Sequence, residues 1–127
     1  MKLQLSIWAE DLPGTSTFGK PDPFAVVTVL HKEVGVKPTL LGKTEVIPNT
    51  NSPDWTKILV LEDFELGKPT HLVISIYDLN KRANTPMGST VFEVGSVLGA
   101  KGSILGKELK TGGFVVAHLE ETTDAGI

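Results

Sequence analysis

The strongest constraint on the fold is a series of short β-rich segments that turn-forming residues separate. Residues 2–9 alternate apolar and polar side chains, which is the pattern of a strand with one buried face. Residues 24–30 are β-branched and almost continuously apolar, so we expect this strand to be buried on both sides. Eight strands are predicted in all, at residues 2–9, 24–30, 41–47, 56–61, 70–77, 89–94, 103–109 and 113–119.

The spacing of these segments favours an antiparallel architecture. Clusters of turn-forming residues lie between them, such as residues 48–55 and residues 110–113. Only residues 94–102 indicate helix, and their glycines limit it to a short turn. Short strands with regularly spaced turn signals are typical of a sandwich. We therefore predict an all-β fold, an eight-stranded antiparallel Greek-key β-sandwich with no helix longer than about two turns.

Length and composition narrow the function classes. The 127 residues suffice for one domain with a real core, which we place at residues 1–120 with a short C-terminal tail at 121–127. The net charge of -3 argues against nucleic acid as a partner. The chain has no cysteine, which excludes disulfides, thiolate metal sites and cysteine nucleophiles and fits a reducing, cytoplasmic environment. No apolar stretch reaches the length of a membrane span, and we expect a monomer.

A glycine-rich stretch at residues 14–24 has the spacing of a phosphate-binding loop, with Gly14, Gly19 and Lys20 in place. That motif needs a Ser or Thr hydroxyl after the lysine, and Pro21 occupies the position instead. The motif must also open a helix, which closely spaced prolines disfavour. These residues therefore predict a loop that leads into a strand and not a nucleotide site.

Three longer stretches resemble the signatures of C2 domains, in the same order and at similar separations. They are AEDLPGTSTFGKPDPFAVV at residues 9–27, GKTEVIPNTNSPDW at 42–55 and VISIYDLNKRANTPMGSTVFEVGSVL at 73–98. The resemblance extends from about residue 2 to residue 120. The stretch GSILGKELKTGGFVVAHLEE at 102–121 looks most like the first C2 domain of copines.

The resemblance implies a sandwich whose Ca²⁺ and membrane site lies in three loops at one end. Only one strand precedes the first of these loops. The final strand, at residues 113–119, should then fill the place that an extra N-terminal strand takes in the other C2 topology. This implies the arrangement called type II.

The resemblance also implies where Ca²⁺ ligands should lie. C2 loops typically supply five acidic side chains, and Ca²⁺ requires six to eight oxygen ligands. The corresponding positions here are Ser16, Asp22, Asp78, Asn80 and Thr85. Only two of them are acidic, so we expect a degenerate site that binds Ca²⁺ weakly, with a Kd of roughly 10⁻⁴–10⁻³ M.

The net charge of the three loops also indicates weak Ca²⁺ binding. Asp22, Asp54 and Asp78 are offset by Lys20, Lys81 and Arg82, whereas an empty Ca²⁺ site should be strongly negative. The alternative role for Asp22 and Asp78 is structural, because turn carboxylates commonly bond to local backbone amides.

Apolar and basic residues near the loop tips suggest membrane contact. The predicted membrane-binding residues are Phe18, Lys20, Lys81, Arg82 and Met87, although Met87 could instead fold back onto the sandwich. Lys43 and Lys57 are candidates for binding a lipid head group, and Glu45 weakens that cluster. Trp55 is interpreted as a packing anchor.

These observations lead to one main hypothesis. We expect a non-catalytic C2 module that associates peripherally with anionic phospholipid membranes, largely without Ca²⁺. The alternatives are a protein-interaction or scaffold module, or a weak Ca²⁺-dependent lipid binder. No cofactor other than weakly bound Ca²⁺ is expected, because the three histidines are scattered and no catalytic cluster is visible.

Overall fold

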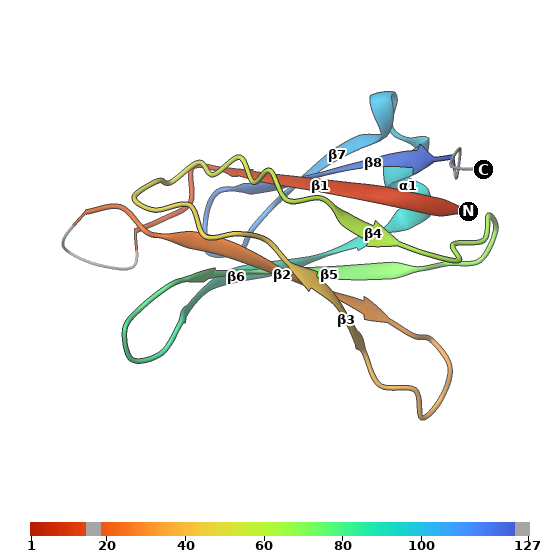
Figure 1. Ribbon diagram of the computed structural model, residues 1–127, viewed down its shortest axis with the longest axis horizontal. Helices are drawn as coiled ribbons and strands as arrows, with labels where there is room; N and C mark the ends of the chain where they lie inside the picture. Colours follow the sequence, from red (N-terminus) through yellow and green to blue (C-terminus); the bar gives the residue numbers. More distant parts are fainter. Residues whose placement is uncertain (15–18, 124–127) are drawn as a thin grey trace.

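The computed structural model describes residues 1–14 and 19–123, which form two antiparallel four-stranded sheets packed face to face (Figure 1). One sheet has the strand order β4-β1-β8-β7 and the other has the order β3-β2-β5-β6. The strands are β1 (Lys2–Glu10), β2 (Pro23–Leu30), β3 (Thr39–Lys43), β4 (Leu59–Leu61), β5 (His71–Asp78), β6 (Thr85–Glu93), β7 (Ile104–Glu108) and β8 (Phe114–Thr122). The predicted eight-stranded antiparallel sandwich is confirmed.

Strand β1 lies in the middle of its sheet, between β4 and β8. Its apolar side chains alternate into the core as predicted, and Leu3, Leu5 and Ile7 are almost completely buried. Strand β8 pairs with it along its whole length, from Lys2 opposite Thr122 to Glu10 opposite Phe114. The last strand thus extends two residues into the stretch assigned to the tail from sequence.

Strand β2 departs from its prediction. Ala25 and Val27 are fully buried in the core, but Val26, Thr28 and the last residues of the strand are only partly buried. The expectation that both sides would be buried is therefore wrong for most of the strand. The outer face of its sheet has no covering layer in the described part of the chain, because the second sheet covers only the inner face.

Strands β3, β4 and β6 also have boundaries that differ from those predicted. Strand β3 ends at Lys43 and not at residue 47. At the next residue, the Ala25 N–H donates to the Thr44 side-chain hydroxyl at 2.8 Å and not to a main-chain carbonyl, so regular strand pairing stops there. Strand β4 is confined to residues 59–61, and β6 begins at Thr85 instead of residue 89. That earlier start follows from the pairing of Thr85 with Asp78 beyond a β-bulge.

Trp55 holds the long β3–β4 connection against the sandwich. It is only 3% exposed, and its indole N–H donates to the Pro23 carbonyl at 3.1 Å. Its interpretation as a packing anchor is confirmed. A buried indole stabilises the fold through its large apolar area, and the hydrogen bond of its N–H fixes the orientation of the ring.

The only α-helix in the described residues is α1 (Val94–Gly99), followed by the 3₁₀ turn η1 (Lys101–Ser103). The Glu93 carboxylate caps α1 by accepting hydrogen bonds from the Ser96 hydroxyl and N–H. These hydrogen bonds, with the Ser96 side chain first, hold the pKa of Glu93 below its usual range. Val94 and Val97 anchor the helix in the core.

Candidate functional site

Three connections meet at one end of the sandwich, which we call the loop end: residues 11–14 with 19–22, residues 48–54 and residues 79–84 (Figure 1). Backbone hydrogen bonds join them. The Thr50 N–H donates to the Pro21 carbonyl at 2.9 Å, and the Leu79 N–H donates to the Asp22 carbonyl at 3.0 Å. The loop end is thus fixed by the backbone over much of its described part.

Asp22 and Asp78 lie side by side at the loop end. Pro23 pairs with Asp78 in the β2–β5 register, which brings the residue before β2 next to the last residue of β5. Asp78 Oδ1 accepts a hydrogen bond from the Asp22 N–H at 2.8 Å, and Asp22 Oδ1 accepts one from the Asn49 N–H at 2.7 Å. Each carboxylate therefore uses at least one oxygen to hold backbone, as turn carboxylates often do.

The other predicted Ca²⁺ positions in the third connection are adjacent. Thr85 pairs with Asp78 in the β5–β6 register, and the Asn80 side-chain amide donates to the Thr85 hydroxyl. Four of the five positions are therefore brought together at one edge, while Ser16 lies outside the described residues. Among residues 1–14 and 19–123, no group of three or more His, Cys, Asp or Glu side chains could hold a metal ion.

Basic side chains at the loop end face solvent. Lys20, Lys81 and Arg82 are exposed, and none of them forms an ion pair with another residue in the described part of the chain. The main-chain N–H of Lys20 donates to Asn49 Oδ1 at 3.2 Å, which orients its segment. The carboxylates of Asp11 and Asp54 are also exposed at the loop end. The Asp11 N–H donates to the Ser52 hydroxyl, which joins the first connection to the second.

The two apolar residues predicted to contact membrane have different outcomes. Met87 is only 2% exposed and belongs to the core, so its side chain is folded into the sandwich and is not on a surface that membrane could reach. The Thr111 hydroxyl donates to the Met87 carbonyl at 2.6 Å and holds this part of β6 in place. Phe18 lies outside the described residues.

The candidate head-group residues Lys43 and Lys57 are exposed on the side of the sandwich. Between them in sequence, the Glu45 carboxylate accepts hydrogen bonds from the Thr56 N–H, the Thr56 hydroxyl and the Lys57 N–H. Partial burial raises the pKa of Glu45, but these hydrogen bonds outweigh burial and lower it to about 2. A negative charge is therefore held against the backbone of Lys57, which weakens attraction for an anionic head group there.

Sequence reasoning missed the contribution of the second connection. Asn49 adopts a left-handed backbone with φ of 55°, and it both donates to Asp22 and accepts from Lys20. The Asn51 side chain donates to the Leu12 carbonyl at 2.9 Å. The signal was present in the cluster PNTNSP, because Asn tolerates this backbone conformation and bonds to nearby backbone.

The family model for the C2 domain matches residues 3–109 of the chain. Synaptotagmin-4 of Arabidopsis thaliana is 28% identical over 92 residues, which is 71% of this chain and 15% of that protein's length. The chain therefore spans only a small part of this relative.

Solved structures share the fold. A C2 domain of a plant extended synaptotagmin 1 superimposes with a TM-score of 0.72 at 19% identity, covering 97% of this chain and 96% of that domain. A structure of two C2 domains, A and B, of extended synaptotagmin 2 gives a TM-score of 0.69 at 25% identity, covering 94% of this chain and 40% of the other. Within the described residues, no helix is long and apolar enough to cross a membrane.

Proposed function

The chain belongs to the C2 domain family, and from this premise we propose that it is a non-catalytic module for peripheral, largely Ca²⁺-independent association with anionic phospholipid membranes. One observation carries the proposal. At the loop end, the carboxylates of Asp22 and Asp78 are engaged by backbone N–H groups, while Lys20, Lys81 and Arg82 are exposed and unpaired within the described residues.

The proposal that the Ca²⁺ site is degenerate follows from the ligand chemistry. Ca²⁺ needs several carboxylates held at one point, and this end offers Asp22 and Asp78 beside the neutral Asn80 and Thr85. Losing the hydrogen bonds to backbone would add a cost to metal binding. We expect Ca²⁺ to bind no more tightly than a Kd of roughly 10⁻⁴–10⁻³ M.

The expected membrane affinity is low and reversible. A basic residue near an anionic surface contributes about 1 kcal/mol, so the three exposed cations together contribute about 3 kcal/mol. Phe18, proposed from sequence alone as an inserting side chain, would add roughly 1.5–3 kcal/mol as an upper estimate. Ordering of the loops on docking subtracts from this total. We propose Lys43 and Lys57 only as secondary contacts, since Glu45 lies between them in sequence.

Two finer assignments also belong to this proposal. We propose the type II arrangement, on the ground that β8 lies between β1 and β7 and that only β1 precedes the first loop. The resemblance of residues 102–121 to copines supports a copine-like subclass. A cytoplasmic location and a monomeric state are expected for the same module.

The test is sedimentation with phosphatidylserine vesicles in the presence of a Ca²⁺ chelator. Lys81→Glu/Arg82→Glu should abolish binding, because it replaces attraction by repulsion at the proposed contact. The matched control is Lys32→Glu/Lys37→Glu, an equal charge change in the exposed β2–β3 connection, which should retain most of the binding. Salt of about 0.5 M should weaken the parent strongly through screening.

The outcomes separate the alternatives. Binding only after Ca²⁺ is added would favour a weak Ca²⁺-dependent lipid binder. No binding to anionic vesicles under any condition would refute the membrane proposal and favour a protein-interaction module. Equal loss in both double variants would show that net charge, and not the loop end, drives association.

A further inference from the structure

A pocket of about 410 Å³ opens at the end of the sandwich away from the loop end. One wall comes from the end of β2 with the following residues 31–33, and Thr39 lies beside them. The other wall comes from the end of β4 with the following residues 62–65 and 68–70. The register of β2 and β5 places Leu30 opposite His71 here and Pro23 opposite Asp78 at the loop end. A pocket of this volume is in the range of small-ligand or side-chain sites.

The interior of the pocket is apolar. Val29, Leu61 and Phe64 line it, and Leu61 and Phe64 are 7% and 4% exposed. Asp63 has a left-handed backbone with φ of 57°, so the chain turns sharply just before Phe64. The Phe64 main chain is held by two hydrogen bonds to Met1, at 3.0 and 2.6 Å. The pocket therefore has a fixed apolar wall on this side.

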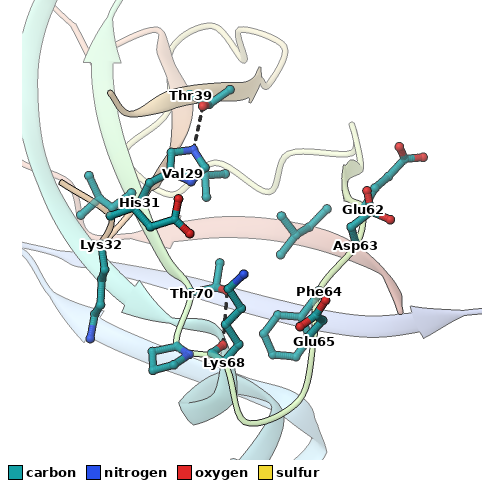
Figure 2. A pocket seen from close by; sticks show the side chains of 14 residues that line it. Val29, His31, Lys32, Thr39, Glu62, Asp63, Phe64, Glu65, Lys68 and Thr70 are labelled. Carbon is teal, nitrogen blue, oxygen red and sulfur yellow. Dashed lines mark hydrogen bonds between the residues drawn. The ribbon is translucent and has the colours of Figure 1, made fainter. Parts of the chain in front are cut away.

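The rim of the pocket is charged, with an acidic excess. Figure 2 shows Glu62, Asp63 and Glu65 on one side, across from His31 and Lys32. Four lining carboxylates, Glu33, Glu62, Asp63 and Glu65, stand against two ammonium groups, those of Lys32 and Lys68, which leaves an excess of two negative charges.

Most of these carboxylates are without a cationic partner. Glu62 lies 4.0 Å from the Lys2 ammonium. Glu33, Asp63 and Glu65 are exposed and form no ion pair with any residue that the structure describes. Even with Glu62 set aside, three carboxylates remain against two ammonium groups, so the rim still favours a cationic partner.

An apolar interior with an acidic rim fits a long cationic side chain. Arginine and lysine lay their methylene groups along apolar surface while the charged end stays near solvent. An arginine guanidinium can also form paired hydrogen bonds with a carboxylate, which adds affinity and direction. An anionic lipid surface would be repelled by the same rim.

We propose that this pocket docks a basic segment of a partner protein. An arginine of that segment lies with its methylene groups on Val29 and Phe64, and its guanidinium reaches Glu33 and Glu65. The proposal does not depend on membrane association, because the pocket and the loop end are at opposite ends of β2 and β5. Both ends can therefore be occupied in one molecule.

The experiment titrates the protein with a short synthetic peptide that has two arginines on each side of a leucine, observed by amide chemical shifts in NMR. We expect saturable shifts in residues 29–33 and 61–70, with a Kd below about 1 mM. A second peptide with glutamate in place of each arginine should cause no saturable shift. Absence of saturable shifts with the arginine peptide, or shifts centred on the loop end, would overturn the proposal.

Matched variants test the charge requirement. Glu33→Lys/Glu65→Lys should weaken peptide binding by about tenfold or more, because two attractive contacts become repulsive. Glu33→Gln/Glu65→Gln should weaken it less. Glu10→Lys/Glu108→Lys changes the net charge equally at exposed residues near Phe114 and should leave affinity within about twofold.

Equal weakening in the pocket and control variants would refute a specific site. Vesicle binding distinguishes peptide docking at the pocket from membrane association at the loop end. The variant Glu33→Lys/Glu65→Lys should not reduce binding to phosphatidylserine vesicles. Peptide binding at the pocket would support this proposal even if the parent protein did not bind such vesicles.

Discussion

The two ends of the sandwich use their charged residues in opposite ways. At the loop end, the carboxylates of Asp22 and Asp78 bond to backbone N–H groups, whereas Lys20, Lys81 and Arg82 are exposed. At the pocket end, the carboxylates are exposed and three of them form no ion pair in the described part of the chain.

The difference shows that residue type alone does not define a site. A carboxylate that holds a turn stabilises the fold and offers less to a ligand, while an exposed and unpaired one contributes to the surrounding field. A molecule with cations free at one end and carboxylates free at the other should present the loop end to an anionic surface.

The largest change should come from restoring acidic ligands at the loop end. Asn80→Asp/Thr85→Asp would place four carboxylates near one edge, and we expect Ca²⁺ affinity to rise by about tenfold or more, measured by calorimetry. The control is Val34→Asp/Leu66→Asp, which adds the same charge at exposed residues of the opposite end. An unchanged Ca²⁺ affinity in the loop-end variant would mean that these residues are not at ligand positions.

Removing a carboxylate should have unequal effects at the two ends. Asp78→Ala leaves the Asp22 N–H without its partner at a site that is 5% exposed, so we expect a loss of roughly 1–3 kcal/mol in the free energy of unfolding. Glu65→Ala removes an exposed carboxylate and should change that free energy by less than about 0.5 kcal/mol. Urea denaturation measures both, and equal values would contradict the contrast between the two ends.

A smaller effect is expected for Glu45, which is held by backbone and a hydroxyl like the loop-end carboxylates. Its pKa is lowered to about 2 in the folded protein, so its ionised form stabilises the fold above the unfolded pKa. That contribution is present above pH about 4.5 and is lost as the pH falls toward about 2. The parent should therefore be more stable than Glu45→Gln at pH 7, and the difference should shrink over this range. A difference that is constant with pH would refute the assignment.

The fold was largely predictable because the alternation of side chains fixes the faces of most strands. Leu3, Leu5 and Ile7 illustrate this, since each falls on the buried face of β1. The errors arose where tertiary contacts replaced strand pairing. The Thr44 hydroxyl accepts a hydrogen bond from the Ala25 N–H. Residues 44–47, which were predicted to continue the strand, therefore belong to the connection after β3.

The candidate site was predictable only in part. The order of the signatures predicts which residues approach one another, and the structure brings Asp22, Asp78 and Thr85 together. The cluster PNTNSP predicts a turn with local hydrogen bonds, but it does not predict which carboxylate the Asn49 N–H contacts, because that connection carries no expected ligand. The pocket was not predicted either, since its two walls are distant in sequence and share no motif.

The central claim is that membrane association does not require Ca²⁺. Its most direct test is the binding of the unmodified protein to phosphatidylserine vesicles, measured by sedimentation in a Ca²⁺ chelator and again with micromolar free Ca²⁺. We predict weak, salt-sensitive binding of equal strength in both conditions. Binding that appears only with micromolar Ca²⁺ would contradict the claim.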